Sequence, residues 1–585
     1  MNMERIWQVI PHDADLVQRL ENSAKVSPVV AQLLAARGIT HADEIQKFLS
    51  APMQDLHDPG LLPNMEAGAR VLFESAKSKK KIRIYGDYDC DGMSGTAILV
   101  NGLRLIGADV SYFIPNRLED GYGLNQEAIE TLKSRGTDLI VTVDCGVASL
   151  DEIQFANDLG LKVIVTDHHE MQADLPAAEA VIHPKLPIGN YPFDGICGAG
   201  VAFKLIWAVF RLASGSDKVQ PEFRDFLVEA LGLASIGTVA DVVPLLDENR
   251  IIVKHGLKSL QKSNRTGIKS LLKVCKLTDK ASLGADDIGF AMGPRLNAAG
   301  RLGQAQLGVE LLTTDSVERA ESLAEYIDGL NASRVSLERS VYLAATKQIK
   351  ENFDPENDPA MVLDGIGWHA GVIGIIAGRI AEKYHRPTVI ISWDKLGMKP
   401  GVGSARSAGT LSLNKAFESC GQHLISYGGH AAAAGLKIEH QKIDAFRSEF
   451  LEYCSMEMTA ADRNPLIRID AEVLLPHLTL STMESLGQMA PFGHSNPRPR
   501  FCATHLAITG DPKTMGGGDR HLTFNVCQND KSFRVVAFGQ GEMRAEIASL
   551  QGEIDLVFHP VVNEFRGLKR IELHLIDWRP SKPNP

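Results

Sequence analysis

The chain has 585 residues, of which 44% are hydrophobic and 23% charged, and its formal net charge is −11 at pH 7. This is the composition of a globular protein with several domains, so it excludes a largely disordered or fibrous chain, and no apolar segment reaches membrane-spanning length. The acidic balance argues against nucleic-acid binding over the whole surface, so any such binding needs locally concentrated basic residues.

The eight cysteines are scattered along the chain and form no C-x-x-C pair. This distribution argues against a disulfide framework and for a reducing compartment. Residues 1–11 lack the apolar core of a signal peptide. We therefore expect a cytoplasmic protein with no membrane association.

The first part of the chain is predicted to form a helical lead-in, followed by alternating helices and strands. Apolar runs at 82–86, 110–114, 138–143 and 162–166 recur about every 25 to 30 residues. This rhythm is typical of βαβ units, so it predicts a parallel sheet covered by helices. Residues 222–275 are predicted to be helical.

Three carboxylates follow the first predicted strand. Asp87, Asp89 and Asp91 stand two residues apart, so on an extended segment they would share one face. Neighbouring anions repel each other unless a cation lies between them. Mg²⁺ and Mn²⁺ prefer such oxygen ligands, although a solvated acidic turn would also explain this motif taken alone.

More candidate metal ligands follow at the ends of later elements. Asp144 comes directly after the third predicted strand, and Asp167, His168 and His169 follow the fourth. Asp241 ends an apolar helical stretch. Because ligands bind at the carboxyl edge of parallel sheets, these side chains should converge. A mixed Asp and His set suits paired Mn²⁺ or Mg²⁺ ions bridged by a carboxylate, the arrangement used for phosphoryl chemistry.

The second half of the chain is predicted to contain three further segments. A long helix is expected to join the domains, a smaller α/β module to follow it, and short alternating strands to form a terminal β-barrel. The predicted domains are 1–65, 66–304, 305–353, 354–460 and 461–580.

Two clusters in the smaller module are candidate anion sites. Ser404 and Arg406 lie in a glycine-rich run, and Arg406 could grip a phosphate with two hydrogen bonds. Gly429 and His430 precede the small residues 431–435, which we interpret as a helix N-terminus with free N–H donors. Tight helix packing is the alternative explanation for these small residues.

Three arginines of the larger module form a second candidate anion site. Arg117 follows a predicted strand end, and Arg295 and Arg301 lie in a segment rich in Gly, Arg and Asn. A salt bridge at the surface is the alternative for each of them taken singly.

The order of these motifs resembles that of the DHH phosphoesterases. Four motifs carry the resemblance: Asp89 with Asp91, Asp144, Asp167 to His169, and Asp241. The later runs around Ser404 and Gly429 resemble the DHHA1 module that accompanies that domain. The form of the first motif, the segment 293–301, the long helix and the terminal barrel are similar to the bacterial single-strand-specific exonucleases of this superfamily.

The resemblance implies an α/β multidomain fold. In it a parallel-sheet DHH domain and a smaller α/β DHHA1 domain are joined by a long helix, and an OB-fold β-barrel follows. It also implies 5′→3′ exonuclease activity on single-stranded DNA, by a two-metal mechanism with Mn²⁺ or Mg²⁺, in DNA recombination and repair. The implied partners are single-strand-binding protein and a repair helicase, and the chain is expected to act as a monomer.

The resemblance also assigns roles to individual residues. Two metal ions would be held by Asp89, Asp91, Asp144, His168 and Asp241. Asp144 would bridge the ions, and His169 and His430 would contact substrate or support the site. The wider superfamily often has a metal-binding His where this chain has Tyr85, so Asp87, His169 or water would complete the first ion's ligands. The substrate-binding residues would be Arg117, Arg295, Arg301, Ser404, Arg406, Gly429 and His430.

Two other functions are compatible with parts of the pattern. One is a DHH/DHHA1 phosphodiesterase of short oligonucleotides or cyclic dinucleotides, which would lack the terminal barrel. The other is a non-catalytic single-strand-binding scaffold, which would be expected to lack a metal ligand.

Overall fold

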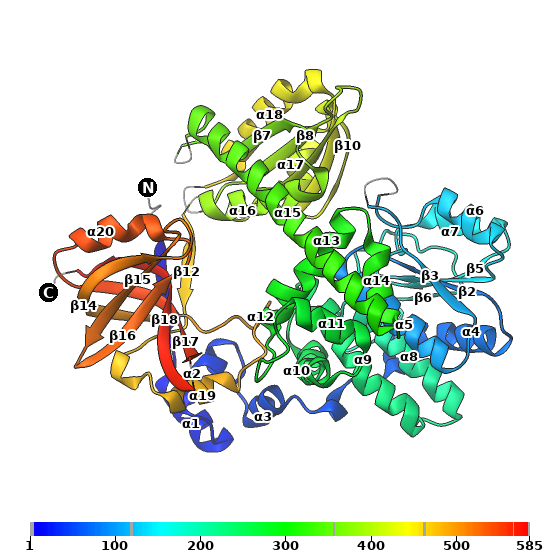
Figure 1. The fold of residues 1–585 in the computed structure, drawn as a ribbon, viewed down its shortest axis with the longest axis horizontal. Helices are drawn as coiled ribbons and strands as arrows, with labels where there is room; N and C mark the ends of the chain where they lie inside the picture. Colours follow the sequence, from blue (N-terminus) through cyan, green and yellow to red (C-terminus); the bar gives the residue numbers. More distant parts are fainter. Residues whose placement is uncertain are drawn as a thin grey trace. The chain divides into compact units, whose positions relative to one another are not determined.

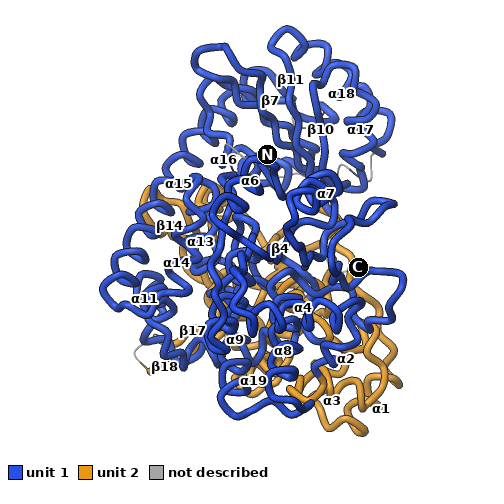
Figure 2. Tube along the Cα trace, turned by 90° about the vertical axis from the view of Figure 1, so that its right-hand side faces the viewer, with its two compact units in different colours: residues 1–4, 56–244, 248–465 blue, residues 5–55, 245–247, 466–585 orange. Residues whose placement is uncertain are grey.

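The computed structural model describes residues 5–117, 121–354, 357–459, 462, 464–565 and 567–582. Residues 460 and 461, where a predicted domain boundary falls, lie outside the described residues. The chain forms two compact units, which Figure 2 shows in different colours. The first contains residues 56–244 and 248–465, and the second contains 5–55, 245–247 and 466–585.

A five-stranded parallel sheet forms the centre of the first module, residues 65–244 and 248–313 of the first unit (Figure 1). Its strand order is β3-β2-β4-β5-β6, from β2 (Ile82–Gly86), β3 (Val110–Phe113), β4 (Leu139–Val143), β5 (Lys162–Thr166) and β6 (Ala180–Ile182). The four strands predicted from the apolar runs are confirmed. Because β3 and β4 flank β2, the order reverses there, and this is where ligands bind in open α/β sheets.

Helices pack around this sheet and extend the module beyond it. Their bounds are α4 (Met65–Lys77), α5 (Cys90–Leu105), α6 (Gln126–Ser134), α7 (Leu150–Asp158), α8 (Gly198–Ser214), α9 (Pro221–Ala240), α10 (Asp247–Lys262), α11 (Thr266–Val274), α12 (Ala285–Asp287), α13 (Gly293–Arg301) and α14 (Ala305–Thr313). A π-helical turn, η3 (Ile288–Met292), runs directly into α13. Helices α5, α8 and α9 pack closely, since a Cβ at Gly102 would lie 2.4 Å from Ile206.

The connecting helix α15 (Val317–Asn352) is 36 residues long. The hydroxyl of Ser316 caps its start by accepting the N–H of Arg319. Its first part packs against α11, α13 and α14, and its last part against β7 and α16. Residues 305–313, which the predicted connecting segment included, form the separate helix α14.

The second module, residues 361–457, contains a mixed five-stranded sheet. The strand order is β10-β11-β9-β8-β7, from β7 (Met361–Ile366), β8 (Thr388–Trp393), β9 (Gly401–Arg406), β10 (Leu424–Gly429) and β11 (Ala433–Ile438). Its helices are α16 (Ala370–Tyr384), α17 (Leu413–Ser419) and α18 (Ile443–Glu457).

One prediction for this module was wrong. Residues 431–435 do not begin a helix, because β10 and β11 form an antiparallel hairpin in which Gly429 pairs with Ala434. The backbone N–H of His430 donates to the Ala433 carbonyl and closes the turn. Glycine and alanine runs suit a tight hairpin as well as a helix, since neither residue specifies a side-chain period.

The second unit is built on the predicted C-terminal barrel. Its strands are β13 (Ala471–Glu472), β14 (Phe501–Met515), β15 (His521–Gln528), β16 (Lys531–Ala537), β17 (Ile554–Phe565) and β18 (Leu568–Pro580), and β14 also pairs with β17 to close the sheet. The helices of this unit are α1 (Ala14–Ala24), α2 (Pro28–Ala36), α3 (Ala42–Ser50), α19 (Leu480–Gly487) and α20 (Arg544–Ser549).

The N-terminal segment is not only helical. Strand β1 (Ile6–Val9) pairs in parallel with β12 (Leu466–Ile469). Leu33 and Leu34 of α2 share one hydrophobic core with Phe501 and Phe558 of the barrel. The lead-in therefore packs on the barrel. Within the described residues, no helix is long and apolar enough to cross a membrane.

Candidate active site

The first acidic motif forms the start of a helix instead of a continued strand. Asp89 is the N-cap of α5, and its Oδ1 accepts the N–H groups of Asp91 (2.8 Å) and Gly92 (3.1 Å). The turn needs a glycine, because a Cβ at Gly92 would lie 2.6 Å from the Asp87 carbonyl oxygen. The expectation of three carboxylates on one extended face is therefore wrong, although all three reach the same site.

Asp91 is fixed by a second helix start. Its buried carboxylate accepts the N–H groups of Gly198 (2.7 Å) and Ala199 (2.9 Å) at the first turn of α8. The positive end of the helix dipole favours an anion at this position. On α9, a Cβ at Gly237 would lie 2.3 Å from Asp91 Oδ1, so only glycine lets this helix approach and place Asp241 at its end.

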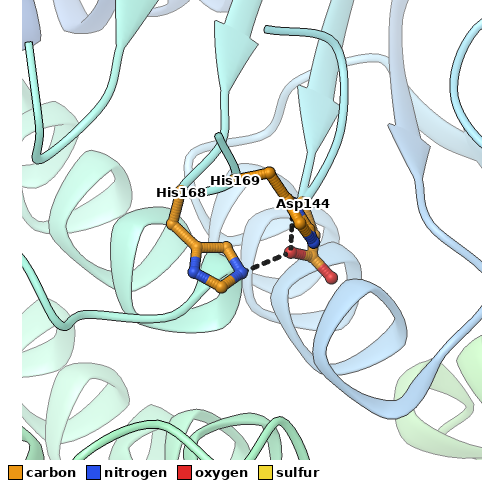
Figure 3. A group of neighbouring side chains, drawn as sticks. All are labelled: Asp144, His168 and His169. Carbon is orange, nitrogen blue, oxygen red and sulfur yellow. Dashed lines mark ion pairs between the residues drawn. The ribbon is translucent and has the colours of Figure 1, made fainter. Parts of the chain in front are cut away.

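One carboxylate oxygen of Asp144 faces both histidines of the third motif (Figure 3). Its Oδ1 is 3.1 Å from His168 Nε2 and 3.7 Å from His169 Nδ1. Its backbone is in the left-handed region, with φ at 64°. Asp144 Oδ1 and His168 Nε2 are shielded from solvent, and neither makes a hydrogen bond. Two close, buried polar atoms without hydrogen bonds indicate a place for a ligand between them.

The side chains converge in three overlapping groups, and within each group the potential ligand atoms lie within 4.8 Å of one another. The groups are Asp87 with Asp89 and Asp144, Asp91 with His168 and Asp241, and Asp144 with His168 and His169. Asp144 and His168 each belong to two of the groups, and of these two only Asp144 is a carboxylate, which can bridge two ions. We call these seven residues the acidic centre.

Crowding of carboxylates perturbs the titration of the acidic centre. Burial, followed by the charges of Asp91 and Asp89, raises the pKa of Asp144 well above its ordinary value. Burial and the Asp89 charge raise the pKa of Asp91 to about 6. Burial and neighbouring aspartates raise the pKa of Asp241 to about 9. A divalent cation would offset this repulsion and keep the carboxylates ionised.

Asp167 orients the two histidines. Its Oδ1 accepts the N–H groups of His168 (2.7 Å) and His169 (3.1 Å), and Oδ2 accepts the N–H of Val147 (3.0 Å). The same Oδ1 is 2.8 Å from His169 Nδ1. Burial opposes the charged form of each partner, but their hydrogen bond lowers the pKa of Asp167 to about 2 and raises that of His169 to about 9. The sequence places Asp167 in a motif but does not show this orienting role.

His168 has a neutral imidazole. Burial and the nearby charge of His169 lower its pKa to about 3. A neutral imidazole nitrogen is the form that binds metal ions.

Tyr85 is not a ligand candidate in this structure. Its side chain is buried, and its hydroxyl donates to the Gly123 carbonyl (3.1 Å). Asp87 has the position near Asp89 and Asp144 instead, and burial together with the Asp89 charge raises its pKa.

Three of the predicted anion-binding arginines lie within electrostatic range of one another. We call Arg117, Arg301 and Arg406 the arginine group. Burial and the charges of Arg117, Arg334 and Arg406 lower the pKa of Arg301 to about 10, against the opposing charge of Glu338. Burial and the Arg117 charge likewise lower the pKa of Arg406. Such a group of like charges favours an anion.

Few contacts within the protein hold these guanidinium groups. Arg406 Nη1 donates to Ser404 Oγ (3.2 Å) and to the Ala405 carbonyl (2.7 Å). Arg301 Nη1 donates to the Gly371 carbonyl (3.2 Å), which links the first module to α16. Arg117 lies 4.9 Å from the centre of the Tyr88 ring, and Tyr88 stands between Asp87 and Asp89. The arginine group is therefore next to the acidic centre.

An ion pair of the connecting helix was missed by sequence analysis. Arg334 Nη1 lies 3.1 Å from Glu338 Oε1, and the two side chains are only 14% and 15% exposed. Arg334 Nε and Glu338 Oε1 are buried without a hydrogen bond. The charge of Arg334 lowers the pKa of Arg301, and the charge of Glu338 opposes this shift. The i,i+4 spacing was visible in the sequence, but most such pairs lie on exposed helix faces.

The other predicted substrate-binding residues are Arg295, Gly429 and His430. Their contacts differ from those of the arginine group. Arg295 Nε donates to Asp328 (2.8 Å), and its Nη1 donates to the Ala291 carbonyl (2.9 Å). Gly429 has a φ of 134°, and a Cβ there would lie 2.5 Å from the Ala433 carbonyl oxygen. His430 is exposed in the hairpin turn. Their roles in substrate binding stay predictions.

Comparison with known proteins identifies the family. Residues 81–237 match the DHH family, N-terminal domain, 357–456 match the DHHA1 domain, and 469–577 match the RecJ OB domain. The single-stranded-DNA-specific exonuclease RecJ of Dickeya dadantii is 36% identical over 558 residues, which cover 93% of this chain and 95% of that protein. The chain belongs to the RecJ family. The resemblance and the fold class inferred from the sequence are thus confirmed.

Other RecJ proteins extend this agreement. The single-stranded-DNA-specific exonuclease RecJ of Bacillus subtilis is 34% identical over 98% of this chain and 70% of its own length. The crystal structure of RecJ in complex with Mn²⁺ from Thermus thermophilus superposes with a TM-score of 0.82 at 30% identity, covering 99% of this chain and 80% of that one. The Mg²⁺ complex of the same protein has a TM-score of 0.76 at 30% identity, covering 99% and 79%.

The acidic centre of this RecJ-family chain fits Mn²⁺ and Mg²⁺ ions. Its donors are carboxylate oxygens and imidazole nitrogens, which suit Mn²⁺ and, for the carboxylates, Mg²⁺. The buried atoms Asp144 Oδ1 and His168 Nε2 lack hydrogen bonds, and the mutual repulsion of the carboxylates calls for positive charge.

Proposed function

We propose that this chain is a metal-dependent exonuclease that hydrolyses single-stranded DNA from its 5′ end. The observation that carries this proposal is that Arg117 of the arginine group lies over the ring of Tyr88, whose two neighbours Asp87 and Asp89 belong to the acidic centre. The first is built to hold cations and the second to hold a phosphate. Membership of a family of single-strand-specific exonucleases supports the same reaction.

The acidic centre would hold two divalent cations. Asp89 with Asp87, and Asp91 with His168 and Asp241, would form the two ligand sets, and Asp144 would be shared. Bound Mn²⁺ or Mg²⁺ supplies an activated water for attack on phosphorus and offsets the charge that develops on the scissile phosphate. His169 is held by Asp167 with Nδ1 at 2.8 Å, so it can remain protonated and face the phosphate as a cation.

The arginine group would determine polarity by anchoring the 5′-terminal phosphate. Arg117, Arg301 and Arg406 would bind its oxygens, with the Ser404 hydroxyl beside Arg406. An anchored end leaves the next phosphate at a fixed distance, and this is the phosphate that the acidic centre would attack. Breaking its bond to the 3′ oxygen of the first nucleotide releases a 5′-mononucleotide. The new end then carries a 5′-phosphate and fits the same anchor.

The second unit would bind the rest of the strand. Its barrel matches the RecJ OB domain, and OB-folds hold single strands by stacking on aromatic rings and by positive charge. Single-strand-binding protein, a repair helicase, a monomeric state, a cytoplasmic location and action in recombination and repair are further parts of the proposal.

A time course on oligonucleotides labelled at the 5′ or the 3′ end tests this function. With Mn²⁺, a 5′ label should appear first as mononucleotide, whereas a 3′ label should pass through a ladder of shortening strands. EDTA should stop both reactions, and an annealed blunt duplex should resist digestion. If instead the 3′ label appeared first as mononucleotide, digestion would run from the 3′ end, and the proposed polarity would be wrong.

The same assay separates the alternative functions. A phosphodiesterase of short oligonucleotides or cyclic dinucleotides would cleave those substrates while sparing long strands. A non-catalytic scaffold would bind the strand and leave it intact with every metal.

A further inference from the structure

An aromatic side chain that the proposed mechanism does not use is exposed on a turn that packs against the end of α9. Phe290 is 83% exposed, the highest exposure among the large hydrophobic side chains of the described residues. It lies in the π-helical turn η3, between the buried residues Ile288 and Met292. An exposed phenyl ring is unfavourable in water, and π-helical turns are often found at functional sites.

The turn that carries Phe290 is held against the end of α9. A Cβ at Gly289 would lie 3.7 Å from the Val239 side chain, and a Cβ at Gly293 would lie 3.5 Å from Ala240. Asp241 of the acidic centre directly follows these two α9 residues. Phe290 is therefore carried by a turn that packs against the two α9 residues directly before a candidate metal ligand.

The turn is also continuous with the arginine group. Helix α13 begins at Gly293, directly after η3, and ends at Arg301. At about 1.5 Å of rise per residue, Phe290 and Arg301 are separated by roughly 16 Å along the helix. A stacked strand rises about 3.4 Å per nucleotide, so this distance corresponds to about five nucleotides or fewer.

We propose that Phe290 is a base-stacking residue, which contacts a nucleobase within the first few nucleotides of the bound 5′ end. We infer a nucleobase as the occupant because η3 packs against the end of α9, just before Asp241, and runs directly into α13, which ends at Arg301. The ring is thus carried by an element that connects the two groups assigned to the DNA backbone. A flat apolar ring accepts every base, as an exonuclease that digests any sequence requires. This inference rests on the proposed function, but its test measures binding as well as cleavage.

Binding is measured in the full chain with Asp144→Ala, so that DNA is not consumed. The probe is a 5′-phosphorylated single strand with a fluorophore at its 3′ end, followed by anisotropy. Adding Phe290→Ala should weaken binding by about tenfold, the effect expected for loss of one base–aromatic contact. Phe290→Trp should retain binding. The slope of affinity against salt should not change, because the ring has no charge.

Leu396→Ala is the matched control. Leu396 is 75% exposed and lies between β8 and β9. Leu396 precedes β9 (Gly401–Arg406), whose last residue is Arg406, so this control changes a similarly exposed apolar side chain beyond the opposite end of β9. It should bind DNA like the parent. Thermal unfolding of each variant confirms that it is folded, as expected for changes at exposed side chains.

A series of abasic substitutions then locates the contact. Removing the base at one position near the 5′ end should weaken binding to the parent by as much as Phe290→Ala does. Binding of the Phe290→Ala variant should not be weakened further when the base at that position is removed. Equal binding by the parent and Phe290→Ala, or additive losses at every position, would overturn the proposal. Failure of the exonuclease function would appear separately, as intact DNA with the wild-type chain and Mn²⁺.

Discussion

The carboxylates of the acidic centre and the guanidinium groups of the arginine group are both crowded like charges, but the protein holds them differently. Backbone donors at the starts of α5 and α8 fix Asp89 and Asp91, and Asp167 fixes the two histidines. The arginines come from the segment after β3, from α13 and from β9, with few hydrogen bonds to hold them. A cation site needs rigid ligands, whereas arginines can adjust to a flexible phosphate.

The largest effect is expected from the shared carboxylate of the acidic centre. Asp144→Ala should lower the rate of single-strand digestion by about 10³-fold or more, because both ligand sets lose a member. Titration with Mn²⁺ by calorimetry should show weakened binding. The control Asp217→Ala changes an exposed aspartate between α8 and α9 and should behave as wild type. Near-normal turnover of Asp144→Ala would contradict the metal assignment.

Asp167 tests whether the rigid support of the acidic centre matters. In Asp167→Asn one oxygen becomes an N–H₂ donor, which cannot accept from both Val147 and the histidines. We expect kcat to fall about 10- to 100-fold, the range for partners that orient metal ligands. The exposed residue Asp158 provides the control Asp158→Asn. A change in KM alone would show that Asp167 does not orient the histidines.

The arginine group should affect the choice of DNA end more than the chemistry. Arg406→Ala should reduce kcat/KM by about tenfold on strands with a 5′-phosphate and by less on strands with a 5′-hydroxyl. Arg406→Lys should recover only part of the loss, since lysine lacks the planar fork. Arg224, which is 68% exposed, serves as the control position. Equal losses on both ends would argue against a terminal anchor.

The smallest effect is expected from the ion pair on α15. Arg334→Ala should raise KM about threefold, because it removes one positive charge near Arg301. Glu338→Gln should lower KM by a similar factor, because it removes an opposing charge. Glu351→Gln is the control, since Glu351 forms an exposed pair with Lys347 at the same spacing on the same helix. Changes of the same sign in the two variants would contradict this electrostatic account.

Much of the fold could be predicted because its signals are local. Buried parallel strands are continuous apolar runs, and the ends of β2, β4 and β5 were marked by Asp or His. The convergence of Asp144 with His168 and His169 followed from the rule that carboxyl ends of parallel strands share one edge, whereas Asp241 comes from the end of helix α9.

The remaining features depend on contacts between distant segments. The sequence could not show that Asp91 accepts N–H groups from α8, or that Arg295 pairs with Asp328 while Arg301 lies near Arg406. The hairpin at Gly429 was predicted as a helix because small residues suit both. No role was predicted for Phe290, because the sequence does not show that it lies in a π-helical turn with its ring exposed.

The capping role of the acidic motif has a consequence for metal exchange. Asp89 and Asp91 are positioned by the folding of α5 and α8 themselves, through hydrogen bonds that do not depend on a cation. Little conformational entropy then remains to be lost when an ion binds. Chelation should therefore leave a folded apoprotein that reloads quickly, so that the cell's ratio of manganese to magnesium can set which ion is used from one encounter with DNA to the next.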